Sequence, residues 1–186
     1  MVERRNGCCL GSVLGIFAIL VVLSILFIYS GFYNVAATYP DKAPVAWLLS
    51  TTMDKSVQRH AKGIKAPALD APAMIQAGFR HYQEDCVMCH GAPGVRIGEV
   101  GRGLNPEPPE LTEAAGDWKP NELFWITKNG VRMSGMPAWG VTNSDKAIWE
   151  IVAFTQKLPS MSSDEYRKLS RQLQSAAASG ASVRSK

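Results

Sequence analysis

The stretch Cys86-Val87-Met88-Cys89-His90 indicates how this chain folds and what it binds. Cys-x-x-Cys-His is the pattern of covalent haem attachment, in which two thiols become thioether links to the porphyrin. Two intervening residues place both sulfurs at one porphyrin edge, and the adjacent histidine can then bring a ring nitrogen onto the iron as proximal ligand. The pentad therefore predicts one haem held by Cys86, Cys89 and His90.

Two other chemistries use a Cys-x-x-Cys spacing. A zinc site requires a second pair of ligands, and no Cys or His follows His90. A thioredoxin-like redox site is expected beside a βαβ pattern, which this sequence does not show. The only other cysteines, Cys8 and Cys9, are adjacent and too cramped for a relaxed intrachain disulfide, so we expect free thiols there.

The composition fits one modest domain with accessory segments. The chain has 186 residues and a formal charge of +4, enough length for a domain near 100 residues to bury a core. Residues 66–160 carry 8 Lys+Arg and 11 Asp+Glu, a net charge of −3. Since the basic excess lies outside the predicted domain, we expect no nucleic-acid partner.

An uncharged block near the N-terminus predicts a membrane anchor. Residues 10–33 are almost wholly apolar, and 24 residues of helix rise roughly 36 Å, enough to cross a bilayer. A cleaved secretory signal is the alternative, with residues 35–37 as a small-residue cleavage site. Its apolar core is normally about 7–15 residues, so the longer segment favours an uncleaved anchor. Arg4 and Arg5 precede it and predict a cytoplasmic N-terminus with the rest exported.

The segment after the anchor is predicted to be a tether. Trp47 and Leu48 begin a short helical pattern, and the basic residues Lys55, Arg59, Lys62 and Lys65 would face lipid headgroups. An ordinary surface helix or stalk fits equally well. The Pro-rich stretch at residues 65–72 reads as a hinge that lets the following domain move along the membrane.

The helix before the pentad carries a family resemblance. Gly78-x-x-x-Tyr82-x-x-x-Cys86-x-x-Cys89-His90 resembles the N-terminal helix of class I c-type cytochromes. In that family the small residue and the aromatic lie against an aromatic of the C-terminal helix, here expected to be Trp149. The C-terminal helix would be capped by Ser144 or Asn143 and end before Pro159.

The same resemblance implies a methionine on the other side of the iron. Gly135-Met136-Pro137-Ala138 is similar to the axial-methionine loop of the family, so Met136 is the expected distal ligand. Met133 is its main competitor. His81 is interpreted as a surface residue, and His60 could ligate only if the tether folded back.

The Gly- and Pro-rich residues 91–120 are expected to be a loop that wraps the haem edge. In the family a prolyl carbonyl accepts the second ring N–H of the proximal histidine, and Pro93 and residues 106–109 are the candidates here. A helix over residues 121–128, ending at Asn129-Gly130, would contribute Leu123 and Phe124 to the core. Trp118 and Trp125 could bond a propionate or simply pack.

The predicted organisation has five parts. They are a cytoplasmic N-terminus (residues 1–9), a transmembrane anchor (10–33), a tether or interfacial segment (34–70), the haem domain (71–160), and a short helix with a tail disordered from Ser175 (161–186). The resemblance covers residues 71–159, about half of the chain. It implies an all-α class I cytochrome c fold preceded by one transmembrane helix.

The function implied is electron transfer. A membrane-anchored monohaem cytochrome would carry single electrons from a quinol-oxidising complex or dehydrogenase to a terminal oxidase or reductase of a respiratory chain. The alternative is a tightly bound subunit of such a complex, and a remote one is a catalytic or sensing haem protein with a labile sixth site. In this family haem is attached by a maturation machinery outside the bacterial inner membrane, which agrees with an exported, periplasmic domain.

Overall fold

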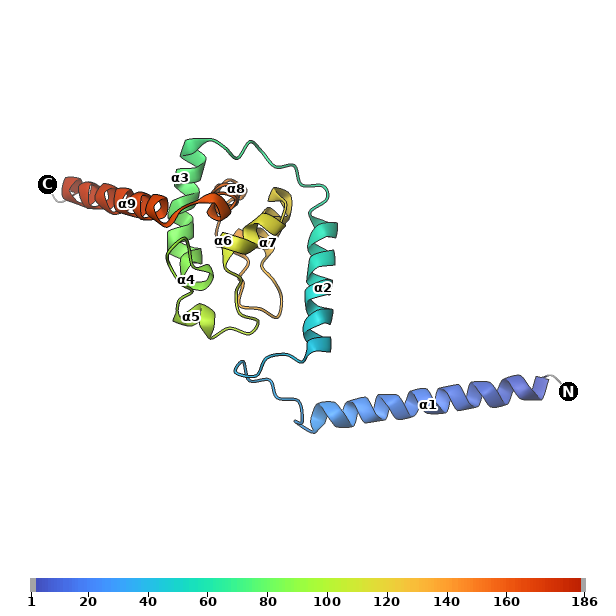
Figure 1. Cartoon of the computed structure of the whole chain (residues 1–186). Helices are drawn as coiled ribbons and strands as arrows, with labels where there is room; N and C mark the ends of the chain where they lie inside the picture. Colours follow the sequence, from blue (N-terminus) through green and yellow to red (C-terminus); the bar gives the residue numbers. More distant parts are fainter. Residues whose placement is uncertain (1–2, 185–186) are drawn as a thin grey trace. The chain divides into compact units, whose positions relative to one another are not determined.

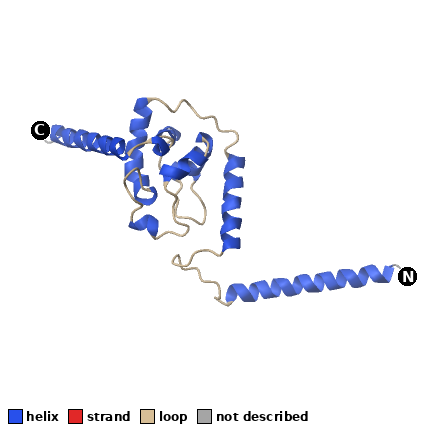
Figure 2. Cartoon of the chain, viewed as in Figure 1, coloured by secondary structure: helices blue, strands red, loops and turns tan. Residues whose placement is uncertain are grey.

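The computed structural model describes the backbone of residues 3–184 and the side chains of residues 11–175. The chain divides into two compact units, Met1–Tyr39 and Pro40–Lys186. The regular elements of the described backbone are helices joined by loops (Figures 1 and 2). The only extended pairing in that part of the chain is an isolated bridge between Ala92 and Val95. The prediction of an all-α fold is confirmed.

The first unit is dominated by one helix, α1 (Glu3–Tyr29). Its Gly11–Tyr29 stretch has a mean hydropathy of 2.8 and buries none of its side chains within the protein. By length and composition this stretch could cross a membrane. The helix ends at Tyr29, before the end of the apolar run at Tyr33, and Gly31 follows with a φ of +66°.

The second unit holds the remaining helices. They are α2 (Ala43–His60), α3 (Pro72–His81), α4 (Val87–His90), α5 (Glu99–Arg102), α6 (Leu111–Ala114), α7 (Pro120–Asn129), α8 (Asp145–Thr155) and α9 (Ser163–Arg184). A π-helical turn, Tyr82–Cys86, joins α3 to α4. Helices α5 and α6 lie within residues 91–120, so the region predicted as a loop contains two short helices.

A close crossing of α3 and α8 forms the centre of the core. A Cβ on Gly78 would overlap the backbone carbonyl of Glu150, which explains the glycine in α3. The Tyr82 ring lies 5.2 Å from that of Phe154, and the Phe79 ring lies 5.3 Å from it. The expected aromatic partner, Trp149, was therefore wrong: Phe154, five residues later, faces α3.

Trp149 packs on the other side of α8. Its ring stacks on Phe124 of α7 at 4.2 Å between centroids, so it joins α7 to α8. Leu123 and Phe124 are buried, as the sequence predicted. Helix α8 begins at the predicted cap, where the Ala147 N–H donates to the Ser144 hydroxyl at 3.3 Å.

Helix α2 is not a free tether. Val57 and Ala61 are fully buried, and the Asn121 side chain of α7 donates to the Ala61 carbonyl at 2.8 Å. The His60 ring stacks on Trp125 at 5.5 Å. Because apolar side chains at i and i+4 share one face of a helix, Val57 and Ala61 dock the end of α2 on the domain. The predicted tether over residues 34–70 is corrected accordingly.

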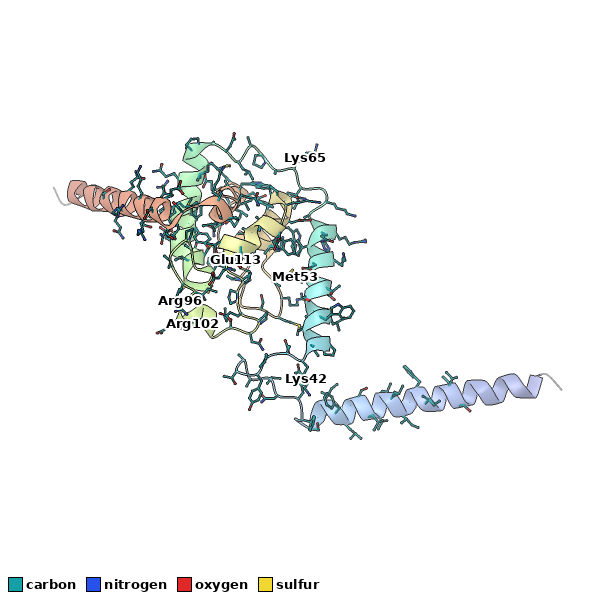
Figure 3. The ribbon with its side chains drawn as sticks, viewed as in Figure 1. Lys42, Met53, Lys65, Arg96, Arg102 and Glu113 are labelled. Atoms are coloured by element: carbon teal, nitrogen blue, oxygen red, sulfur yellow. The ribbon has the colours of Figure 1, made fainter. Side chains whose placement is uncertain are left out.

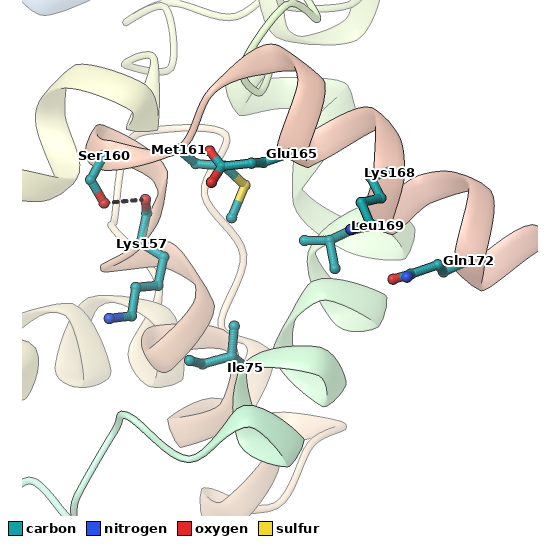
Figure 4. A pocket seen from close by; sticks show the side chains of 8 residues that line it. All are labelled: Ile75, Lys157, Ser160, Met161, Glu165, Lys168, Leu169 and Gln172. Atoms are coloured by element: carbon teal, nitrogen blue, oxygen red, sulfur yellow. Dashed lines mark hydrogen bonds between the residues drawn. The ribbon is translucent and has the colours of Figure 1, made fainter.

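Helix α9 extends the domain beyond the predicted boundary. Tyr166 is buried among Phe79 and Phe154, and Leu169 packs at the margin of the core. Figure 4 shows Leu169 and Met161 beside Ile75, where α9 borders α3 in a shallow groove. The predicted disorder from Ser175 differs from the structure, in which the helix runs to Arg184. Alanine has the highest helix propensity, which accounts for the continuation.

Candidate haem site

The two cysteines and the histidine of the pentad lie on one short helical segment. Cys86 ends the π turn and is buried, while Cys89 and His90 of α4 are partly buried. The Tyr82 hydroxyl donates to the Gly91 carbonyl at 2.7 Å, which ties the start of the segment to its end. Chain reversal follows at Gly91, whose φ is +63°. The two thiols and the imidazole therefore lie on the same short segment of the chain.

The imidazole of His90 has a fixed orientation. Its Nδ1 lies 2.9 Å from the carbonyl oxygen of Pro109, and since a carbonyl only accepts, Nδ1 carries the proton. Burial lowers the pKa of His90, opposed in part by this hydrogen bond. The ring is therefore neutral at pH 7 with the Nε2 lone pair available, the form that binds iron. Among the candidate prolines, Pro109 makes the contact.

The environment of Cys86 disfavours the redox-thiol alternative. Burial, with smaller contributions from the Asp85 carboxylate and from Cys89, raises the pKa of the Cys86 thiol to about 12. Redox-active cysteines have lowered pKa values instead. The zinc alternative is not supported either, because no three His, Cys, Asp or Glu side chains form a metal-binding group within the described residues.

The structure distinguishes the two candidate methionines. Met136 is partly buried, and its N–H donates to the Ser134 hydroxyl at 3.2 Å. The Val131 N–H donates to the Met136 carbonyl at 3.2 Å, which closes the loop on itself. Met133 has a φ of +61° and is 73% exposed, so its side chain lies at the surface. Met136 is therefore the less exposed of the two candidate methionines.

Glycines hold the methionine loop close to its neighbours. A Cβ on Gly130 would lie 2.7 Å from the Pro137 carbonyl carbon, and its φ of +67° is one that glycine adopts readily. A Cβ on Gly135 would overlap the Leu104 side chain. The loop before Pro109 and the loop that carries Met136 therefore meet at Leu104.

His60, His81 and Trp118 make contacts with other residues. Nε2 of His81 lies 3.7 Å from a carboxylate oxygen of Glu150, and His60 stacks on Trp125. Trp118 packs against the core, and its carbonyl accepts from the Gln156 side chain at 3.3 Å. His81 is thus partly buried beside Glu150 and not a simple surface residue.

The residues present fit a haem. They combine a neutral, oriented imidazole, two cysteines one helical turn apart beside it, and a partly buried thioether in a loop fixed by hydrogen bonds. Pro109 and Leu104 are the contributors that the sequence pattern did not single out. The only signal for Pro109 was its place in a Pro-rich run that carried several equivalent candidates.

Residues 73–154 match the family model described as cytochrome C oxidase, cbb3-type, subunit III, which is a cytochrome c domain. The matched region runs from α3 to α8 and includes the pentad and Met136. A search of curated proteins finds no significant match. With the helical fold and the attachment segment, this match supports a class I c-type cytochrome domain over residues 73–154, and with it a haem-based electron-transfer protein.

Proposed function

We propose that this protein is a membrane-anchored monohaem cytochrome that carries single electrons. Its donor is a quinol-oxidising complex or dehydrogenase, and its acceptor a terminal oxidase or reductase. The observation that carries the proposal is the His90–Pro109 hydrogen bond on the segment that holds both cysteines. That bond fixes the tautomer and the ring orientation of His90, as is usual for a histidine that binds a metal.

Each site residue has a separate role. Cys86 and Cys89 would hold the haem through thioether links, and Nε2 of His90 and the Met136 sulfur would bind its iron. The bound haem supplies a one-electron ferrous–ferric couple, and a methionine ligand raises its reduction potential. The Pro109 carbonyl orients the imidazole, and the Gly130 and Gly135 contacts hold the methionine loop in place.

Two protein ligands favour electron transfer over catalysis. A catalytic or sensing haem protein needs a vacant or labile sixth position, whereas Met136 lies in a loop closed by the Val131–Met136 and Ser134–Met136 hydrogen bonds. With that position filled, the iron has no site for a substrate. Redox partners would then dock transiently, through a small interface.

Helix α1 supports the proposed location. It would anchor the protein in the bacterial inner membrane, with Arg4 and Arg5 in the cytoplasm and the haem domain on the periplasmic side. The maturation machinery that attaches haem would act on that side.

A redox titration of the full chain in mild detergent tests the proposal. We expect one reversible one-electron transition and a ferrous form that binds CO slowly, because Met136 must first dissociate. Rapid binding of CO or cyanide by the folded protein would contradict the assignment and indicate an open iron site.

A tightly bound subunit of a larger complex is the second candidate. The observation that favours it is the match to a family named for an oxidase subunit. Purification in mild detergent at several salt concentrations separates the two candidates. A mobile carrier dissociates as the salt is raised, whereas a subunit held by helix packing stays with its complex.

A further inference from the structure

Helix α2 has one face that belongs to the cytochrome domain. Val57 and Ala61 on this face are fully buried, and His60 stacks on Trp125 of α7. Met53 is one helical turn before Val57, is partly buried, and lies on the side of α2 turned toward α7 (Figure 3). This face fixes the position of α2 within its unit.

The opposite face is basic and exposed. At 100° per residue, Leu48, Lys55 and Arg59 lie roughly opposite Val57, and Lys62 continues the line just past the end of the helix. All four are exposed. Among the described residues none of the three basic side chains pairs with a carboxylate, although Lys55 bonds the Gln58 side chain at 3.5 Å. We name Leu48, Lys55, Arg59 and Lys62 the outward face.

The start of α2 carries two exposed apolar side chains, Leu48 on the outward face and Trp47 beside it. Trp47 is 67% exposed and Leu48 is 57% exposed. Tryptophan is enriched at membrane–water interfaces, where its ring has both apolar and polar contacts. Basic residues next to a membrane anchor are attracted to an anionic bilayer surface, and exposed apolar side chains beside them can enter the interface.

The chain length brings this end within reach of the membrane. Thirteen residues, 30–42, separate the end of α1 from the start of α2. Fully extended they span at most about 45 Å. They include further exposed apolar side chains, those of Phe32, Val35 and Tyr39. If α1 is anchored, α2 therefore begins no more than about 45 Å from the end of the anchor.

We propose that the outward face of α2 lies on the anionic surface of the bilayer that holds α1. Trp47 and Leu48 enter the interface, and Lys55, Arg59 and Lys62 contact lipid phosphates. Because the other face of α2 is docked on α7, this contact sets the orientation of the haem plane relative to the membrane. The inference rests on the membrane anchor and the haem of the proposed function.

Linear dichroism of the haem Soret band tests the inference with the full-length haem protein. The transition lies in the porphyrin plane, so aligned bilayers with a fixed haem angle give a dichroic signal. In bilayers that contain phosphatidylglycerol we expect a signal clearly different from zero. In pure phosphatidylcholine it should decrease several-fold, because the attraction is about 1 kcal/mol per basic residue near an anionic surface.

Two matched variants make the test specific. The triple variant Lys55→Glu, Arg59→Glu, Lys62→Glu should lose the signal while it keeps the visible spectrum of the wild type. The control variant Lys157→Glu, Lys168→Glu, Arg171→Glu changes the charge equally on exposed residues elsewhere and should keep the signal.

Three outcomes would overturn the inference. The first is the absence of linear dichroism in the wild-type protein, which is expected if α2 instead binds an acidic protein. The second is a dichroic signal that the triple variant retains. The third is a signal of equal size in both lipids. An absence of haem absorbance would instead refute the proposed function, so the two failures are distinguishable.

Discussion

At Gly78 a single hydrogen atom in place of a side chain allows α3 and α8 to cross. We predict that Gly78→Ala lowers the free energy of unfolding by about 3 kcal/mol or more, because a Cβ there would overlap the rigid Glu150 carbonyl. Urea denaturation followed by helical circular dichroism measures the change. Gly116→Ala is the control, since a Cβ at that position meets nothing within 4 Å. Equal stability of both variants would contradict the close crossing.

Met136 and Met133 differ in burial and should differ in effect. We expect Met136→Ala to abolish the methionine–ferric charge-transfer band, lower the reduction potential and open the iron to cyanide. Met133→Ala should leave all three unchanged, because its side chain is 73% exposed. Absorption spectra and potentiometry of the two ferric proteins give the comparison, and a reversed result would assign Met133.

At the residue scale the sequence predicted those features that a local pattern specifies. The pentad can be recognised from its spacing, and the Gly-Met-Pro loop from its resemblance to the loop of the family. The partner of Tyr82 could not, because Trp149 and Phe154 are both aromatic and only the rotation of α8 against α3 places Phe154 opposite. The choice of Pro109 among the candidate prolines could not be predicted either, because it depends on how a loop folds back over His90.

The start of α9 should respond to acid. The Ser162 N–H and hydroxyl both donate to the Glu165 carboxylate at 2.7 Å and lower its pKa below the ordinary 4.5. A lowered folded-state pKa stabilises the fold above the unfolded-state value, and this contribution is lost as the pH falls through the folded-state pKa. We predict that Glu165→Gln reduces the loss of stability between pH 5 and pH 3.

Thermal unfolding at several pH values measures this effect. Ser162→Ala removes the hydroxyl donor and should shift the pH dependence in the same direction, by less, because the backbone N–H still donates to Glu165. An unchanged acid slope in the Glu165→Gln variant would show that the cap does not stabilise α9.

Docking of α2 on α7 should be measurable. Val57→Ala removes two buried methyl groups and should cost about 2 kcal/mol in unfolding free energy, with faster hydrogen exchange in α2. Val100→Ala, at a position 56% exposed, is the control and should cost little. If neither variant changes the exchange of α2, the helix is the free tether that the sequence first suggested.

At the element scale, helix ends were predictable and helix contacts were less so. Gly130 and Ser144 act where the sequence placed them, because caps satisfy local backbone groups. The docking of α2 was missed because its buried face is small, chiefly Val57 and Ala61. The length of α9 was underestimated because an Ala- and Ser-rich composition was interpreted as disorder.

At the scale of the whole molecule, two sequence signals with unrelated physical origins agree. An apolar helix is long enough to cross a membrane, and the resemblance of the haem-attachment segment to the family implies an exported domain. The order of the two segments, the apolar helix first and the haem domain second, follows directly from the sequence. The division at residues 39 and 40 could not, because it follows from the packing of α2 on α7.

The most direct test of the central claim is intact-mass spectrometry of the full chain combined with its pyridine haemochrome spectrum. We predict one haem per chain that survives denaturation, with a thioether-type spectrum. Cys86→Ser with Cys89→Ser should abolish the bound haem, whereas Cys8→Ser with Cys9→Ser should retain it. A haem-free chain, or a haem that denaturation releases from the wild type, would contradict the claim that Cys86 and Cys89 hold it covalently.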